Sequence, residues 1–229
     1  MCDSQPATSI SKVPAVRTQK GRFQHMKVAI IGAGNVGKAL ATSITRAGHE
    51  VTMSASTPES ARQAADAVGV NAAGNNADAT RDAEVVILAV PFVGAGEEVA
   101  RGIREAVAGK TVVDVTNPLK PDYSGLATEG TSAAEEFQKQ LPEASVVKAF
   151  NTIFASNQAN PSADIDGFVA GDDDKAKQKV MSLIQSIGFS PVDVGPLQAA
   201  RHLEGMAFIN IGLNAQNGWS WTSAWKLDR

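Results

Sequence analysis

Short apolar runs alternate along the chain with longer stretches in which apolar residues recur three or four positions apart. The runs predict β-strands over residues 28–31, 50–53, 85–90, 111–115, 146–150, 168–170 and 191–194. The longer stretches predict helices over 36–47, 59–68, 94–108, 132–140 and 175–187, followed by an apolar segment over 199–217. Near-continuous apolar strands separated by helices are typical of a parallel sheet covered on both faces. The pattern therefore predicts an α/β fold with a doubly wound, mainly parallel sheet and added C-terminal strands and helices.

The first predicted strand runs into a glycine-rich turn and then into a helix. Gly32, Gly34 and Gly37 form the pattern G-x-G-x-x-G. In this pattern the first glycine permits a tight turn, the second lets the main chain approach a pyrophosphate, and the third lets the helix lie close to the strand. The free N–H groups and the positive dipole end of the helix favour phosphate groups. In this context the motif predicts a Rossmann-type domain that binds a dinucleotide.

The end of the second predicted strand bears on the choice between NADP and NAD. NAD sites carry an acidic residue about 20 positions after the glycine pattern, where it binds the ribose diol. Here the strand ends in Ser54-Ala55-Ser56-Thr57, with no acid at its tip. Hydroxyl groups suit a 2′-phosphate, so the sequence favours NADP, and NAD stays possible because no arginine stands at the tip. Capping of the next helix is an alternative role for Ser56 and Thr57.

Three further strands end in groups that would face the same crevice, since such sheets bind ligands beyond the carboxyl ends of their strands. These groups are Val90-Pro91-Phe92 after the fourth strand, Asn117-Pro118 after the fifth and Asn151 after the sixth. Phe92 is expected over the crevice, although a core position at the strand end would also suit it. The loop over 117–131 is long enough to form a lid.

Composition adds limits on domain organisation and location. The 229 residues carry a net charge of −3 and are 43% hydrophobic, which supports one domain and gives no electrostatic footprint for nucleic acid. Polar, aperiodic residues 1–25 predict a disordered leader, followed by a dinucleotide-binding domain over 26–197 and a helical tail over 198–229. No apolar run approaches the ~20 residues of a membrane helix, and the leader lacks the apolar core of a signal peptide. A cytoplasmic protein is expected.

Candidates for acid–base or metal chemistry are few. The single cysteine, Cys2, lies in the leader and the three histidines are scattered, so no metal site is predicted. Three consecutive acids over 172–174 precede a lysine-rich helix and are interpreted as a helix N-terminal cluster. Tyr123, Lys148 or His202 would be needed as a proton donor only if the substrate were a carbonyl. No catalytic residue is assigned.

Several motifs resemble the family of NADP oxidoreductases that depend on the deazaflavin coenzyme F420, from residue 26 to about 205. They are the glycine turn, Ala89-Val90-Pro91, Gly171-Asp172-Asp173-Asp174, and Val194-Gly195-Pro196-Leu197 followed by Arg201. The stretches over 114–118 and 148–151 are also similar to the cytoplasmic domain of transmembrane metalloreductases. The resemblance implies cofactor contacts at Ala33, Gly34, Asn35, Val36, Ala55, Ser56, Pro91 and Phe92, with Ala155 near the nicotinamide. Family members with a clear NADP preference carry Ser-Arg or Arg-Arg where this chain has Ser56-Thr57.

The resemblance implies an oxidoreductase that transfers a hydride between NADP(H) and a small-molecule acceptor, coenzyme F420 or a flavin. The alternative is a non-catalytic dinucleotide-binding sensor or partner-binding protein, because no acid–base pair is evident. A carbonyl or imine reductase is a third possibility, which would need a larger substrate domain than the residues after 194 provide. The apolar segment from 199 onward, with Trp219, Trp221 and Trp225 beyond it, predicts a homodimer contact. A tail that folds back on its own sheet is the alternative.

Overall fold

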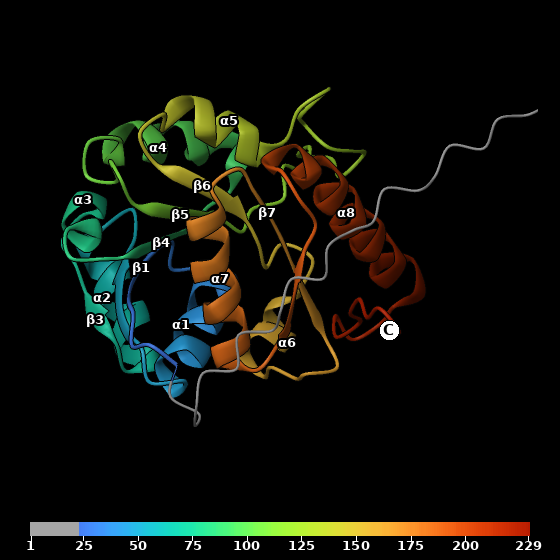
Figure 1. The fold of residues 1–229 in the computed structure, drawn as a ribbon, viewed down its shortest axis with the longest axis horizontal. Coiled ribbons are helices and arrows are strands. Elements are labelled where there is room, and N and C mark those ends of the chain that lie inside the picture. The colour runs from blue at the N-terminus through green and yellow to red at the C-terminus, as the bar shows by residue number, and fades with distance from the viewer. Residues whose placement is uncertain (1–22) are drawn as a thin grey trace, which may run out of the picture.

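The protein forms an eight-stranded sheet in the computed structural model, which describes residues 23–229. The strands are β1 (Lys27–Ile31), β2 (Glu50–Ser54), β3 (Asn71–Ala72), β4 (Val85–Leu88), β5 (Thr111–Asp114), β6 (Ser145–Lys148), β7 (Asp166–Gly171) and β8 (Ser190–Asp193). Their spatial order is β3-β2-β1-β4-β5-β6-β7-β8 (Figure 1). All neighbouring strands are parallel except β6 and β7, which pair antiparallel. The predicted doubly wound, mainly parallel α/β sheet is confirmed.

Helices cover both faces of this sheet because successive side chains of each strand point to opposite faces. Val28 and Ile30 of β1 pack in a core with α1 (Asn35–Arg46), α2 (Pro58–Val68) and α7 (Asp174–Ile187). Ala29 and Ile31 pack in a second core, on the opposite face, with α3 (Asn76–Thr80), α4 (Glu97–Ile103) and α5 (Ala133–Gln140). The glycine turn between β1 and α1 therefore emerges at the carboxyl edge of a sheet buried on both sides.

The seven predicted strands are all present, with ends that differ by one to two residues from the apolar runs. Three short elements escaped the pattern: β3, α3 and α6 (Ala155–Ala159). Each has five residues or fewer, which is too short to show a period. The helix predicted over 94–108 is instead η1 (Phe92–Gly96) followed by α4. Gly94 has a φ of 94°, a left-handed conformation that no regular helix contains, so the regular helix begins only after the glycines.

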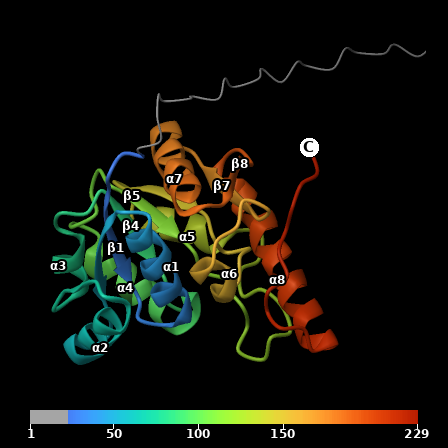
Figure 2. The same cartoon turned by 90° about the horizontal axis from the view of Figure 1, so that it is seen from below.

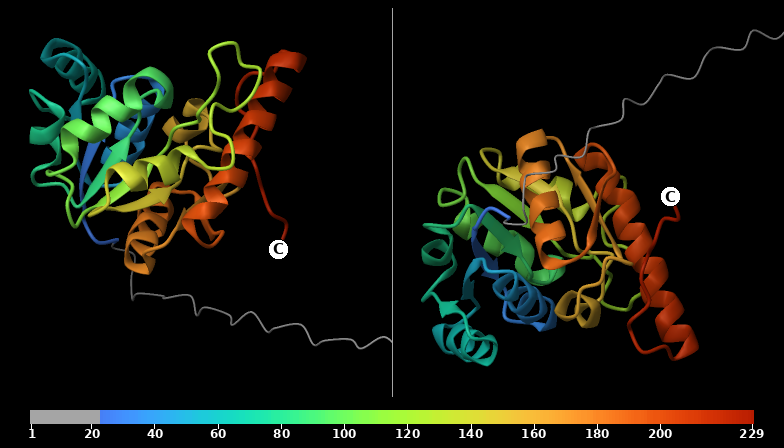
Figure 3. Two further views of the ribbon diagram at one scale, coloured as in Figure 1. Left: turned by 90° about the horizontal axis from the view of Figure 1, so that it is seen from above. Right: turned by 60° about the horizontal axis from the view of Figure 1, so that its bottom comes forward.

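The C-terminal segment lies along the edge of the sheet formed by β7 and β8. After η2 (Leu197–Ala199), the long helix α8 (Ala200–Asn217) runs away from the sheet, and residues 218–229 turn back (Figure 2). The Asp166 amide donates to the Trp225 carbonyl oxygen at 3.0 Å, and the Leu227 amide donates to Asp166 Oδ2 at 2.6 Å. The final residues therefore fold back on β7, while α8 projects at the opposite end of the molecule from α2 and α3 (Figure 3).

The predicted leader, 1–25, lies almost entirely outside the described residues. Within 23–229, no helix is both long and apolar enough to span a membrane.

Candidate functional site

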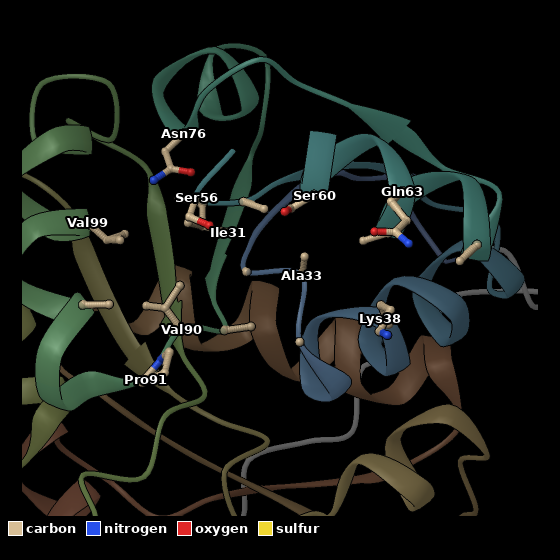
Figure 4. A pocket seen from close by; sticks show the side chains of 17 residues that line it. Ile31, Ala33, Lys38, Ser56, Ser60, Gln63, Asn76, Val90, Pro91 and Val99 are labelled. Atoms are coloured by element: carbon tan, nitrogen blue, oxygen red, sulfur yellow. The ribbon is translucent and has the colours of Figure 1, made fainter. Parts of the chain in front are cut away.

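A cavity of about 750 Å³ opens above the carboxyl ends of β1, β2 and β4. Seven of the predicted site residues line it: Gly32, Ala33, Gly34, Ala55, Ser56, Val90 and Pro91. Sequence reasoning missed other residues of its wall, among them Lys38, Ser60, Gln63, Asn76 and Val99. Figure 4 shows Ser60 and Gln63 on α2 and Lys38 on α1, with Val90, Pro91 and Val99 on the other side of the cavity.

The three glycines of the turn have different structural reasons. A Cβ on Gly32 would lie 2.2 Å from the Ala89 carbonyl oxygen, and a Cβ on Gly37 would lie 2.0 Å from the Gly32 carbonyl oxygen. Gly32 also has a φ of +124°, so the protein's own packing demands glycine at both positions. A Cβ on Gly34 would meet nothing within 4 Å. Gly34 therefore leaves space for a group outside the protein.

The N-terminus of α1 borders this open space. Gly34 is the N-cap residue and no side chain caps the helix. Because the first N–H groups of a helix have no intrahelical partner and its dipole is positive there, this end suits an anion. Lys38, on the next turn, is the one charged side chain among the described residues that line the cavity. The turn can thus hold a pyrophosphate.

The corner between β2 and α2 forms the far wall of the cavity. Thr57 is the N-cap of α2: its Oγ1 accepts from the Ser60 amide at 3.1 Å. Thr57 does not line the cavity, whereas Ser56 and Ser60 do. Ser54 Oγ donates to Asn76 Oδ1 at 2.8 Å, which ties α3 to the strand end. No acidic residue belongs to the described lining, so a phosphate at this corner would meet no like charge.

The end of β4 divides its residues between the cavity and the core. Val90 and Pro91 line the cavity. Phe92 is partly buried: it packs edge-on against Phe137 with a centroid separation of 5.4 Å, on the outside of the core around α4 and α5. Phe92 therefore packs toward this core and is not among the residues that line the cavity.

The predicted groups after β5 and β6 meet in a second, smaller cavity of about 100 Å³. Asn117, Asn151 and Ala155 line it together with Val36 of α1 and residues of α6 and α8. Asn117 and Asn151 are joined by two hydrogen bonds of 3.0 Å, one to a side chain and one to a backbone carbonyl. Val36 is two residues from Gly34, so each cavity is lined by a residue at the N-terminus of α1. Asn35 lies with Ala155 at an open surface depression, and Pro118 and Gly37 line none of these spaces.

Lys148 does not reach either cavity. Its Nζ lies 2.8 Å from Asp114 Oδ2, 2.8 Å from Glu204 Oε1 and 2.6 Å from the Thr116 carbonyl oxygen, and all three charged side chains are fully buried. Burial, opposed by the Lys148 ammonium, raises the pKa of Glu204 to about 7. The hydrogen bonds of Lys148, at the end of β6, thus join α8 to the end of β5. Lys148 is 34 residues from Asp114 and 56 residues from Glu204 in the chain. The spacing of residues in the sequence gives no signal over such separations.

Tyr123 and the acidic run over 172–174, two other candidates for catalysis or metal binding, do not line either cavity. Tyr123 is 68% exposed at the tip of the 117–131 loop. Asp173 Oδ1 accepts from the Ala176 amide and caps α7, and Asp172 Oδ1 accepts from the Leu197 amide. The interpretation of this acidic run as a helix N-terminal cluster is confirmed for Asp173. Among the described residues, no group of three or more potential ligands could hold a metal ion.

Comparison with known proteins connects this chain to one family. A family model described as NADP oxidoreductase, coenzyme F420-dependent, matches residues 27–118. A candidate F420-dependent NADP reductase from Arthrobacter sp. FB24, known from a crystal structure, is 31% identical. The match covers 89% of this chain and all of that one, with a TM-score of 0.81. A hypothetical protein from Sinorhizobium meliloti is 33% identical over 76% of this chain and 88% of its own, with a TM-score of 0.68.

A curated relative is a longer protein. Metalloreductase STEAP3 of Rattus norvegicus is 31% identical over 180 residues, which make up 78% of this chain and 36% of STEAP3. The chain thus spans about a third of the length of that relative.

Proposed function

Because the chain belongs to the family of coenzyme F420-dependent NADP oxidoreductases, we propose that it transfers a hydride between NADP(H) and a deazaflavin or flavin-like acceptor. The open space at Gly34 is the observation that carries this proposal, since a Cβ there would meet no protein atom within 4 Å. In this arrangement the pyrophosphate lies on the α1 N-terminus, the adenosine half lies at Ala55 and Ser56, and the nicotinamide half extends toward Val36, Asn117 and Ala155.

The lining of the larger cavity supports NADP over NAD. A carboxylate at the end of β2 would bind the ribose diol of NAD and repel a 2′-phosphate. The described lining instead offers the hydroxyls of Ser56 and Ser60 and the amide of Gln63, with Lys38 as its charged group. A lysine near a phosphate gives a charge-assisted contact. Family membership supports a nicotinamide dinucleotide as cofactor, and the hydroxyls, amide and lysine of this lining support its 2′-phosphorylated form.

Hydride transfer between a nicotinamide and a deazaflavin or flavin requires little acid–base chemistry from the protein. The nicotinamide and the deazaflavin or flavin supply the reactive atoms when bound. The chain's residues hold the phosphates, orient the two rings and exclude water between them. This division of roles agrees with the lining of the two cavities, in which Lys38 is the one charged side chain among the described residues.

Steady-state oxidation of NADPH tests the proposal. Reduced cofactor absorbance is followed with coenzyme F420, FMN, FAD and a ferric chelate as separate acceptors, with NADH as the matched donor. We expect turnover with a deazaflavin or flavin and a preference for NADPH. Tight binding of NADPH without turnover on any acceptor would instead identify a dinucleotide sensor. Turnover with the ferric chelate alone would assign a metal-reducing activity, as the name of the rat relative suggests for that protein.

A homodimer through α8 is a second part of the proposal. Two large apolar side chains of α8 are exposed: Ile209 by 55% and Leu213 by 40%. The chain carries no charged residue between Glu204 and Lys226. A two-fold contact places the same surface against itself, which an uncharged apolar face permits without like-charge repulsion. The opposite face of α8 lines the smaller cavity, so a partner on α8 would also support that wall.

A further inference from the structure

Two residues that line the smaller cavity each carry a hydrogen-bond acceptor without a donor. Asn151 Oδ1 and Gln158 Oε1 have no hydrogen-bond partner, although the two side chains are only 6% and 1% exposed. A buried acceptor left unpaired costs about 1–3 kcal/mol. Both residues line the same cavity of about 100 Å³. A ligand group that donates hydrogen bonds would therefore be stabilised there.

The orientation of both amides follows from their neighbours. Gln158 Nε2 donates to the carbonyl oxygens of Phe150 at 3.2 Å and Ile153 at 2.9 Å. Asn151 Nδ2 donates to the Leu203 carbonyl oxygen and to Asn117 Oδ1, each at 3.0 Å. Backbone carbonyl oxygens only accept, so turning either amide over would set oxygen against oxygen. The two side-chain oxygens are thus held as acceptors.

The remainder of the cavity restricts what can occupy it. The other lining side chains are mostly apolar or aromatic, and none of the described ones is charged. A volume of about 100 Å³ corresponds to roughly three water molecules at about 30 Å³ each, which admits a small planar group and excludes a three-ring system. A neutral primary amide, with two N–H donors on one nitrogen, matches two acceptors in an apolar slot.

We propose that this cavity receives the carboxamide of the nicotinamide ring, with Asn151 Oδ1 and Gln158 Oε1 accepting from its NH₂ group. The inference rests on the proposed use of NADP(H). Asn151 and Gln158 are then positioning residues: they fix the rotation of the nicotinamide ring and so decide which of its faces meets the acceptor. Gln158 has this role through α6, an element that the sequence pattern did not reveal.

Binding of a cofactor analogue tests the assignment directly. The analogue 3-acetylpyridine adenine dinucleotide phosphate carries a methyl group where NADP⁺ carries the carboxamide NH₂, and otherwise has the same groups. Calorimetry is used to compare both ligands on the wild-type protein. We expect NADP⁺ to bind on the order of tenfold more tightly, because the analogue leaves both acceptors unpaired. Equal affinities for the two ligands would overturn the assignment.

Variants then connect this ratio to the two residues. Gln158→Met and Asn151→Leu remove one acceptor each at similar side-chain size, and both should weaken NADP⁺ binding while changing analogue binding little. Asn160→Leu is the matched control, because Asn160 is exposed at the end of α6 and does not line the cavity. A ratio that persists in both folded variants would overturn the role of these side chains.

A crystal structure of the wild-type protein with NADP⁺ decides the question even if a variant does not fold. The carboxamide nitrogen within hydrogen-bond distance of both oxygens supports the assignment, and a water molecule in that place refutes it. Failure of the proposed function has a different signature: wild-type protein that binds neither dinucleotide overturns both ideas. Binding with the expected ratio but no turnover leaves the carboxamide site and removes only the enzymatic activity.

Discussion

At the scale of single residues, the structure separates glycines that the fold needs from the glycine that a ligand needs. Gly32 and Gly37 approach backbone oxygens so closely that a Cβ would lie at 2.2 and 2.0 Å. Gly34 has a φ of −74° and a ψ of −174°, which any residue can adopt. Its Cβ would project into open space. The same residue type in one motif thus serves two physical purposes.

Replacement of Gly34 by valine should therefore affect binding and leave folding largely intact. The side chain would occupy the place of the pyrophosphate, and we expect NADPH affinity to fall at least tenfold. The free energy of unfolding should change by only about 1 kcal/mol, the typical effect of an unfavourable N-cap residue. Titration calorimetry and thermal unfolding measure the two effects. Gly37→Val is the contrasting variant and should unfold the domain. Unchanged NADPH affinity in Gly34→Val would contradict the placement of the pyrophosphate at Gly34.

Glu204 gives a prediction for the pH dependence of stability. Its pKa is about 7 in the folded protein against an ordinary value of 4.5, so between these values the folded state binds more protons than the unfolded state. The free energy of unfolding should then fall as pH rises through this window, by an amount on the order of a few kcal/mol. In Glu204→Gln, which cannot ionise, urea unfolding between pH 5 and 8 should show a flatter dependence.

Glu135 is the control for that experiment. Its two carboxylate oxygens accept from Arg201 at 2.7 and 2.8 Å, and this hydrogen bonding holds the pKa of Glu135 below its usual value. Its contribution to stability is therefore lost only in acid below about pH 4.5. Glu135→Gln should keep the wild-type slope between pH 5 and 8. An equal slope in wild type and Glu204→Gln would show that Glu204 is not the group responsible.

At the scale of elements, the start of α2 assigns different tasks to adjacent residues. Thr57 caps the helix through Ser60, and Ser56 faces the cavity. The sequence permitted either task for either residue, because serine and threonine are equally at home in caps and in phosphate sites. Only the direction of each side chain in the folded corner distinguishes them.

The two positions should respond differently to arginine. Ser56→Arg is expected to raise the preference for NADPH over NADH several-fold, through a charge-assisted contact with the 2′-phosphate. Thr57→Arg should lose about 1 kcal/mol of helix capping and change the preference less. Ser56→Asp, with the opposite charge, should shift the preference toward NADH. The ratio of kcat/KM values for the two donors is the measurement, and a ratio unaffected by either change at Ser56 would place the 2′-phosphate elsewhere.

At the scale of the whole molecule, the cofactor crevice and α8 lie at different ends of the sheet. The larger cavity is built on β1, β2 and β4, near one end, whereas α8 packs at the edge formed by β7 and β8 (Figure 3). The smaller cavity lies between the larger cavity and α8, and Ala207, Asn210 and Ile211 of α8 line it. A change at the outer face of α8 can thus reach the site without touching the dinucleotide.

The proposed dimer allows a test of whether a contact at the outer face of α8 supports the smaller cavity. Wild-type protein should have twice the mass of one chain by light scattering at micromolar concentration. Ile209→Asp places a charge at the centre of the proposed two-fold contact and should yield monomers. Ala108→Asp, at an exposed position beyond α4, is the control and should remain dimeric. A monomeric wild type would refute the dimer. Full acceptor turnover in a monomeric Ile209→Asp protein would show that the contact does not support the site.

The sequence by itself determined the seven longer strands, most of the longer helices, the Rossmann-type class and the glycine turn, because these depend on the spacing of neighbouring residues. The tertiary structure alone decided the direction of β7, since an apolar run reads the same in a parallel and an antiparallel strand. It also decided that Lys148 meets Glu204 across 56 residues of chain, and that Gln158 is left with an unpaired oxygen beside Asn151. Both features depend on where distant segments lie in the folded chain and on which hydrogen bonds their neighbours already make. The spacing of neighbouring residues in the sequence determines neither.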